Sequence, residues 1–217
     1  MRVFLSGASG GIGAALARHY AVAGAKLGLA ARRQDRLSEL IAALPGEHAG
    51  YPLDVADAAA LKAAAEDFIA RCGCPDIVIA NAGISVGTLA DDADDLHAFR
   101  RVFETNVMGM AQTLQPFIAA MKARGSGRLV GIASVAGIRG LPGAGAYCAS
   151  KAATIAYLEA LRGELRGSGV KVVTIVPGYI ATPMTAANPY PMPFLLQADE
   201  AARRFARAGR KPRGLDL

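Results

Sequence analysis

A phenol and an amine stand four positions apart in this sequence. Tyr147 and Lys151 lie in a stretch of helical period, so both side chains should lie on one face of a helix. A free phenol has a pKa of about 10, and a neighbouring cation favours the phenolate and lowers that value. The pair could therefore exchange a proton near neutral pH. Because Tyr-x-x-x-Lys also occurs by chance in many helices, the spacing needs further support.

A serine is expected close to this pair. Ser134 directly follows an apolar run at residues 128–133, which is typical of a buried strand. Its hydroxyl could hold the carbonyl oxygen of a substrate while a hydride arrives at the carbon. The alternative is a turn hydroxyl without a catalytic role.

A glycine-rich turn joins the first apolar run to the first helical stretch. Glycine permits positive φ and lets the backbone approach a pyrophosphate, and the helix N-terminus offers free N–H groups to the anion. Such a turn is weak evidence alone, but its place between a strand and a helix favours a dinucleotide site. The residues expected to bind the phosphates are Gly7, Ser9, Gly10, Gly11, Ile12 and Gly13.

Two arginines follow the second apolar run. Arg32 and Arg33 stand where an NAD-specific site would place Asp or Glu, and no carboxylate is available there to repel a 2′-phosphate. Two guanidinium groups can hold that phosphate through charge-assisted hydrogen bonds. We therefore predict NADP(H) as cofactor. The alternative is a surface arginine pair on the first turn of a helix.

Six apolar runs alternate with five helical stretches along the 217 residues. With 53% hydrophobic and 19% charged residues the chain is not disordered, and the runs are apolar throughout, as buried parallel strands are. This order predicts an α/β fold, a doubly wound, Rossmann-like parallel sheet in a single domain spanning residues 1–217. The expected strands are 3–6, 26–31, 49–53, 76–80, 128–133 and 170–176, and the expected helices are 11–24, 35–44, 57–72, 95–124 and 146–167.

The segment 177–197 breaks this pattern. It contains five prolines, too many for a regular element, together with several large apolar side chains. Because it follows the carboxyl end of a strand, we interpret it as the substrate loop, and the alternative is a loop that only stabilises the sheet. A last amphipathic helix is expected at 198–208.

The charge of +6 does not indicate nucleic-acid binding, since six basic residues lie between positions 203 and 213 and the remainder is nearly balanced. No apolar run approaches the roughly 18 residues of a membrane span.

Cys72-Gly73-Cys74 has neither redox nor metal-ligand spacing, so we expect free thiols and no metal site. These features favour a cytoplasmic protein. The basic last helix could alternatively touch anionic lipid.

The motifs together resemble the short-chain dehydrogenases/reductases. From residue 2 to about residue 207, the order of the motifs is that of the family. They are Ser6-Gly7, Gly11-Ile12-Gly13, Asn81-Ala82-Gly83, Asn106, Ser134, Tyr147-x-x-x-Lys151 and Pro177-Gly178. The resemblance implies an oxidoreductase that transfers a hydride between NADP(H) and a carbonyl/alcohol substrate, which the apolar segments suggest is apolar or of medium size.

The resemblance also implies a role for each catalytic residue. Tyr147 would be the general acid in reduction and the base in oxidation, and Lys151 would bind the nicotinamide ribose and lower the pKa of Tyr147. Ser134 would orient and polarise the carbonyl. Asn106 would hold a water as part of a proton relay, unless it only bonds its own helix backbone.

Further cofactor contacts are implied at three places. Asp54 and Val55 would meet the adenine, although Asp54 could simply cap a helix. Asn81, Ala82 and Gly83 would line the adenosine ribose, although Asn81 could mainly bridge two strands. The residues implied around the nicotinamide are Pro177, Gly178, Ile180 and Thr182.

Two departures from the family pattern stand out. Gly10 occupies a position that is basic in many NADP-dependent members, and 215–217 is either a vestige of the family's last strand or the end of a shortened chain. The resemblance implies a homodimer or homotetramer formed through 95–124 and 146–167. A non-catalytic NADP(H)-binding sensor or scaffold of the same fold is the main alternative. A methyltransferase would leave Tyr147 and Lys151 unexplained.

Overall fold

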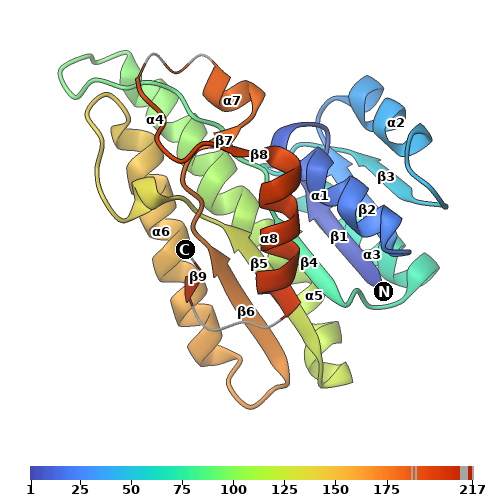
Figure 1. Ribbon diagram of the computed structural model, residues 1–217. Helices are drawn as coiled ribbons and strands as arrows, with labels where there is room; N and C mark the ends of the chain where they lie inside the picture. The colour runs from blue at the N-terminus through green and yellow to red at the C-terminus, as the bar shows by residue number, and fades with distance from the viewer. Residues whose placement is uncertain (187, 189, 211–214, 217) are drawn as a thin grey trace.

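The computed structural model describes residues 1–186, 188, 190–210 and 215–216. Within them, a parallel sheet of seven strands in the order β3-β2-β1-β4-β5-β6-β9 lies between two layers of helices (Figure 1). Its strands are β1 (Arg2–Ser6), β2 (Lys26–Ala31), β3 (Ala49–Pro52), β4 (Ile77–Ala80), β5 (Gly127–Ile132), β6 (Val170–Ile175) and β9 (Leu215–Asp216). The long helices are α1 (Gly11–Val22), α2 (Gln34–Ala42), α3 (Ala58–Cys72), α4 (Asp95–Phe103), α5 (Gly109–Arg124), α6 (Gly145–Glu164) and α8 (Ala198–Arg210).

The strands are apolar throughout because both faces of the sheet are covered. In β1, Val3 and Leu5 pack into the cluster under α1, α2 and α8, while Phe4 packs into the cluster under α3, α5 and α6. The ring of Phe4 contacts Phe117 and Phe68, with ring centroids 4.8 and 5.7 Å away. Burying one such side chain stabilises the fold by about 1.5–3 kcal/mol. The doubly wound sheet predicted from the sequence is confirmed.

The strand order changes direction between β1 and β4. After β1 the chain adds β2 and β3 on one side, and then crosses to add β4, β5 and β6 on the other. At such a switch point the loops that follow the two central strands diverge and leave a crevice at their carboxyl ends. At the far edge, Leu215 and Asp216 pair with Thr174 and Ile175 of β6, so a two-residue last strand is present. Leu217 lies outside the described residues.

The helix expected at 95–124 is in fact two helices joined by a π-helical turn. The turn η1 (Glu104–Met108) follows α4 and leads directly into α5. Asn106 lies in this turn and is buried. A π-helical turn holds one residue more than an α-helical turn, which changes the direction of its side chains. Such turns are frequent at functional sites. The apolar pattern runs on across the turn, which is why the sequence did not reveal it.

The segment 177–197 contains regular elements, so the expectation that its prolines exclude them was wrong. Two short strands, β7 (Ile180–Ala181) and β8 (Leu196–Gln197), pair in parallel, and α7 (Pro183–Ala186) lies between them. Pro183 is the first residue of α7, where a missing N–H leaves no hydrogen bond broken. The two ends of the segment are therefore hydrogen-bonded to each other through β7 and β8.

The predictions on membrane spans, cysteines and the basic last helix can each be compared with the structure. No helix in the described part of the chain is long and apolar enough to cross a bilayer. Cys72, Cys74 and Cys148 are free thiols. On α8, Arg203 and Arg204 both form ion pairs with Glu200. Lys211 and Arg213 lie outside the described residues.

Candidate active site

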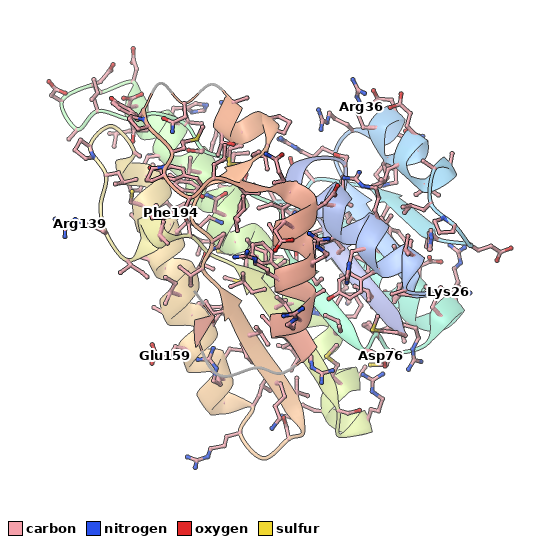
Figure 2. All side chains as sticks on the ribbon, in the orientation of Figure 1. Lys26, Arg36, Asp76, Arg139, Glu159 and Phe194 are labelled. Atoms are coloured by element: carbon pink, nitrogen blue, oxygen red, sulfur yellow. The ribbon has the colours of Figure 1, made fainter. Side chains whose placement is uncertain are left out.

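A cleft of about 660 Å³ lies at the carboxyl ends of the strands, on the switch point of the sheet. Figure 2 shows Phe194 among the loops on this side of the molecule, with Lys26 and Asp76 near the opposite edge. The residues predicted from the sequence that line the cleft are Gly7, Ser9, Gly10, Gly11, Ile12, Arg32, Arg33, Asp54, Val55, Asn81, Ala82, Gly83, Ser134, Tyr147, Lys151, Pro177, Gly178, Ile180 and Thr182. Gly13 and Asn106 lie behind its wall.

The glycine-rich turn forms one end of the cleft. Gly7 and Gly11 have φ of 68° and 51°, which side chains rarely adopt. A Cβ at Gly13 would lie 2.0 Å from the Gly7 carbonyl oxygen, so Gly13 allows α1 to pack on the turn rather than touching a ligand. The Asn81 amide donates to the carbonyls of Ser6 and Gly7 at 3.3 and 3.1 Å. Asn81 thus both lines the cleft and bridges β4 to the turn.

Two exposed arginines lie beside this turn. Arg33 Nη2 donates to the Ser9 carbonyl at 3.3 Å, which ties the guanidinium to the glycine-rich segment. Arg32 Nη1 lies 3.7 Å from Asp54 Oδ2. The end of β2 itself carries no carboxylate, as predicted, but β3 brings Asp54 alongside Arg32.

The helix-capping alternative for Asp54 is not what the structure shows. Asp57 caps α3 by accepting from the Ala60 N–H at 2.9 Å. Asp54 Oδ1 accepts from the Ala56 N–H at 3.0 Å, inside the preceding turn. Its second oxygen faces Arg32 and the cleft.

The three proposed catalytic side chains converge at the other end of the cleft. The Ser134 hydroxyl oxygen accepts from the Ala136 N–H at 3.2 Å, which leaves its O–H available as a donor, and the same group hydrogen-bonds the Tyr147 phenol. Lys151 Nζ donates to the Ile132 carbonyl at 2.8 Å and lies 5.7 Å from the centre of the Tyr147 ring. Ile132 ends β5, so the sheet itself positions the amine.

The pKa of Tyr147 is shifted in the direction opposite to the one expected beside a cation. Burial raises the pKa of the Tyr147 phenol above its ordinary value, and the hydrogen bond from Ser134 only partly opposes this. Burial likewise lowers the pKa of Lys151 to about 8, because the side chain is only 5% exposed. Loss of water around the phenol is thus the largest cause of the Tyr147 pKa shift, and Lys151 is not among the groups that shift it.

Asn106 holds the loop that follows β4. Its Oδ1 accepts from the Ile84 N–H at 2.8 Å, and its Nδ2 donates to the Ile84 carbonyl and the Ser150 hydroxyl, both at 2.9 Å. A Cβ at Gly83 would lie 3.3 Å from Asn106 Oδ1 and 3.6 Å from Lys151 Nζ. The amide oxygen and the amine therefore both border the position that a side chain at Gly83 would take.

Some lining residues were missed. They are Ala31, Leu53, Ile84, Thr105, Ile132, Ala133, Pro183, Met184 and Thr185. Most adjoin a predicted residue and could have been found by extending each motif by one position. Thr185 is different, because its role depends on a local fold: its hydroxyl donates to the Ile180 carbonyl at 2.6 Å and accepts from the Thr182 N–H at 3.1 Å.

A second hollow of about 450 Å³ lies between the segment after β6 and α8. Pro177, Gly178 and Ile180 line both hollows, so this segment separates them. Phe194, at the edge of the second hollow, is 96% exposed and has φ of 59°, an uncommon conformation for a bulky side chain. Backbone strain of this kind often marks a functional site.

Comparison with known proteins assigns the family. The sequence model of the protein family described as short chain dehydrogenase matches residues 2–191. The chain therefore belongs to the short-chain dehydrogenase/reductase family, whose members are oxidoreductases that use a nicotinamide cofactor. The resemblance noted from the motifs is thereby confirmed.

Three similar proteins illustrate the match. An uncharacterized oxidoreductase of Myxococcus xanthus is 39% identical over 202 residues, covering 91% of this chain and 79% of that protein. The ketoacyl reductase HetN of a Nostoc species is 35% identical, covering 82% of this chain and 63% of its own length. The crystal structure of a short-chain type dehydrogenase/reductase from Mycobacterium marinum superimposes with a TM-score of 0.89 at 28% identity, covering 100% of this chain and 92% of that chain.

Proposed function

We propose that the protein transfers a hydride between NADP(H) and a carbonyl/alcohol substrate. The observation that carries this proposal is the convergence of Ser134, Tyr147 and Lys151 at one end of a cleft whose other end is a glycine-rich turn. The turn fits a dinucleotide, because a Cβ at Gly10 would lie 3.3 Å from Arg33 Nη2 and one at Gly11 3.2 Å from Thr182 Cγ2, which would narrow the cleft where a pyrophosphate would approach the backbone. When bound, the cofactor supplies or accepts the hydride.

The side chains then have separate tasks in carbonyl reduction. Ser134 donates its O–H to the carbonyl oxygen and so polarises the carbon. Tyr147 gives its phenolic proton to the oxygen as negative charge develops, a role suited to a phenol whose raised pKa keeps it protonated. Lys151 holds the ribose of the nicotinamide. In alcohol oxidation the proton moves the opposite way.

A proton must then return to Tyr147. We infer a relay in which a water near Gly83 connects Lys151 Nζ with Asn106 Oδ1. This is supported by the positions of these two atoms, which would lie 3.6 and 3.3 Å from a Cβ at Gly83. Both N–H groups of the Asn106 amide are already donated, so only its oxygen could accept from that water.

The preference for NADP(H) rests on Arg32 and Arg33. Both line the cleft beyond β2, where a 2′-phosphate on the adenosine ribose would lie. Arg33 keeps most of its N–H groups available after donating to Ser9. For Arg32, the phosphate would compete with Asp54. Asp54 and Val55 would meet the adenine, while Pro177, Gly178, Ile180 and Thr182 would enclose the nicotinamide.

An apolar substrate of at least medium size is the second part of the proposal. Exposed apolar side chains occur in the segments after β5 and β6, namely Val135, Ile138, Leu141, Met184 and Phe194. Of these, Met184 lines the cleft, and Val135 and Phe194 line the adjoining hollow. Such a concentration of apolar surface beside a catalytic cleft is typical of a binding site. The name of one relative, a ketoacyl reductase, is consistent with a carbonyl on an apolar chain. The segment 177–197 would be the substrate loop.

The alternative is a sensor or scaffold that binds NADP(H) without turnover. It predicts binding of the cofactor and no oxidation of NADPH with any carbonyl compound. The convergence of Ser134 and Tyr147 favours the enzyme, because a binding protein needs no proton donor at that end of its cleft.

One experiment tests the proposal. NADPH oxidation is followed with ketones and aldehydes of increasing chain length, for the wild-type protein and for Tyr147→Phe. We expect kcat/KM to rise about fourfold per added methylene while the chain still finds apolar contacts. Tyr147→Phe should lower kcat by roughly 10²–10⁴ with little change in NADPH affinity. An unchanged rate in Tyr147→Phe would eliminate the proposed proton donor.

A further inference from the structure

Ser150 lies between the two catalytic side chains of α6 but does not line the cleft. It is completely buried. Its hydroxyl donates to the Tyr147 carbonyl at 2.7 Å and accepts from Asn106 Nδ2 at 2.9 Å. The hydroxyl therefore donates its proton within α6, to Tyr147, and accepts a hydrogen bond from Asn106 in the π-helical turn.

These bonds continue beyond Asn106. The Asn106 amide pairs with both the N–H and the carbonyl of Ile84, as one strand residue pairs with another. Ile84 and its neighbour Gly83 line the cleft. Ser150 is thus the link in α6 of a buried chain of hydrogen bonds that runs from the Tyr147 backbone, through the π-helical turn, to the wall of the cofactor cleft.

A second hydroxyl lies one turn further along α6. Thr154 Oγ1 lies 3.0 Å from the Ser150 carbonyl oxygen and 3.4 Å from the Asn106 carbonyl oxygen, and it is fully buried. Buried hydrogen bonds of this kind fix geometry strongly, because a group that loses its partner finds no water to replace it.

We propose that Ser150 is a positioning residue for the reaction: through Asn106 it sets the spacing between the Gly83–Ile84 wall of the cleft and the helical turn that carries Tyr147 and Lys151. The inference rests on the proposed function. The spacing matters because Asn106 Oδ1 and Lys151 Nζ flank the space beside Gly83, where a shift of either group changes the path between them.

Loss of the Ser150 hydroxyl has a defined consequence. Ser150→Ala leaves one N–H of the Asn106 amide buried without an acceptor, so the amide must turn or Ile84 must loosen. We expect kcat to fall about five- to tenfold, the effect of one buried hydrogen bond. The affinity for NADPH should change by less than about threefold, since the glycine-rich turn and the arginines lie elsewhere in the cleft.

The test is a double-mutant cycle on kcat with Ser150→Ala, Asn106→Ala and both together. If Ser150 acts through Asn106, Ser150→Ala should cost less than about twofold in the Asn106→Ala background. Ser150→Thr, which keeps the hydroxyl, should retain more activity than Ser150→Ala. Ser168→Ala is the matched control, because Ser168 donates to the Leu165 carbonyl near the opposite end of α6. It should lower stability without lowering kcat.

A readout independent of activity completes the design. Hydrogen exchange at the Ile84 amide should be faster in Ser150→Ala than in the wild-type protein, and unchanged in Ser168→Ala. Additive effects in the cycle, or unaltered exchange at Ile84, would overturn the inference. Tyr147→Phe is measured in parallel: if it alone remains fully active, the proposed function fails, whereas additive effects with an inactive Tyr147→Phe refute only the role of Ser150.

Discussion

At the scale of single residues, Lys151 carries an amine where almost no water reaches. Its pKa is lowered to about 8 by burial, whereas lysine in an unfolded chain titrates near 10.5. Between these values the unfolded state binds more protons, so stability rises with pH in that window and is lost again as pH falls through about 8. At neutral pH the buried ammonium therefore costs the fold about 3 kcal/mol.

We expect Lys151→Met to abolish turnover without destabilising the protein at pH 7. Between pH 8 and 10.5 the wild-type free energy of unfolding should rise by up to about 3 kcal/mol relative to this variant. Urea unfolding at several pH values measures the difference. Lys62→Met, at an exposed lysine of α3 paired with Glu66, is the control and should show no such divergence. Parallel curves for Lys151→Met would show that the amine is not desolvated.

The arginine pair gives a second prediction at this scale. Replacing Arg32 and Arg33 with Ala should weaken NADPH binding by about 1.5–3 kcal/mol for each charged hydrogen bond lost, and should leave NADH binding almost unchanged. Fluorescence titration with both cofactors measures this. Arg36→Ala, on the exposed face of α2 and paired with Glu39, is the matched control. An equal loss for NADPH and NADH would contradict the assignment of the 2′-phosphate site.

At the scale of elements, the glycine-rich turn depends on how closely α1 approaches β1. A Cβ at Gly13 would lie 2.0 Å from the Gly7 carbonyl oxygen, so Gly13→Ala must displace the helix. We expect a loss of about 1–3 kcal/mol in stability and a clear loss of cofactor affinity. Gly163 in α6 has open space around it, and Gly163→Ala should stabilise the protein by up to about 1 kcal/mol. Thermal unfolding of the two variants should therefore move in opposite directions.

Most of the elements were predictable because their signals are local. Each expected strand lies within about one residue of the observed one, since apolar runs between glycine-rich turns leave little choice of boundary. The π-helical turn at Asn106 was not predictable, because its extra residue leaves the apolar face of the helix intact. The β7–β8 pair was missed for a different reason: two-residue strands carry no period, and their pairing joins residues 180 and 196.

The cleft also combines features that local sequence signals predict with features that depend on tertiary packing. The motifs predicted which side chains line it, because carboxyl ends of parallel strands meet at one edge of the sheet. They did not predict the contact of Arg32 with Asp54 or the raised pKa of Tyr147. Both depend on distances and on water exclusion that arise only when segments far apart in sequence pack together.

At the scale of the whole molecule, α6 presents an unusual outer face. Figure 1 shows this helix along one side of the molecule, and four alanines spaced three or four residues apart on it are exposed: Ala149, Ala152, Ala156 and Ala160. Small side chains allow helices to approach closely. This surface fits the homodimer or homotetramer that the resemblance implies.

We expect the protein to sediment as a dimer or tetramer and Ala156→Arg to shift it toward the monomer. The arginine would stand between two closely packed helices and carry a charge with no partner. Ala63→Arg, at an exposed position of α3, is the control and should leave the assembly unchanged. Analytical ultracentrifugation over a range of concentrations decides the matter, and a wild-type monomer at all of them would contradict the prediction.

The exposed ring of Phe194 has a thermodynamic consequence for the whole molecule. A phenyl group kept in water at the edge of a binding region is surrounded by ordered solvent that an oily ligand would release. Calorimetry of substrate binding between 10 and 35 °C should therefore show a negative change in heat capacity, and Phe194→Ser should make that change smaller. The protein would then hold its substrate by the same force that folds its core.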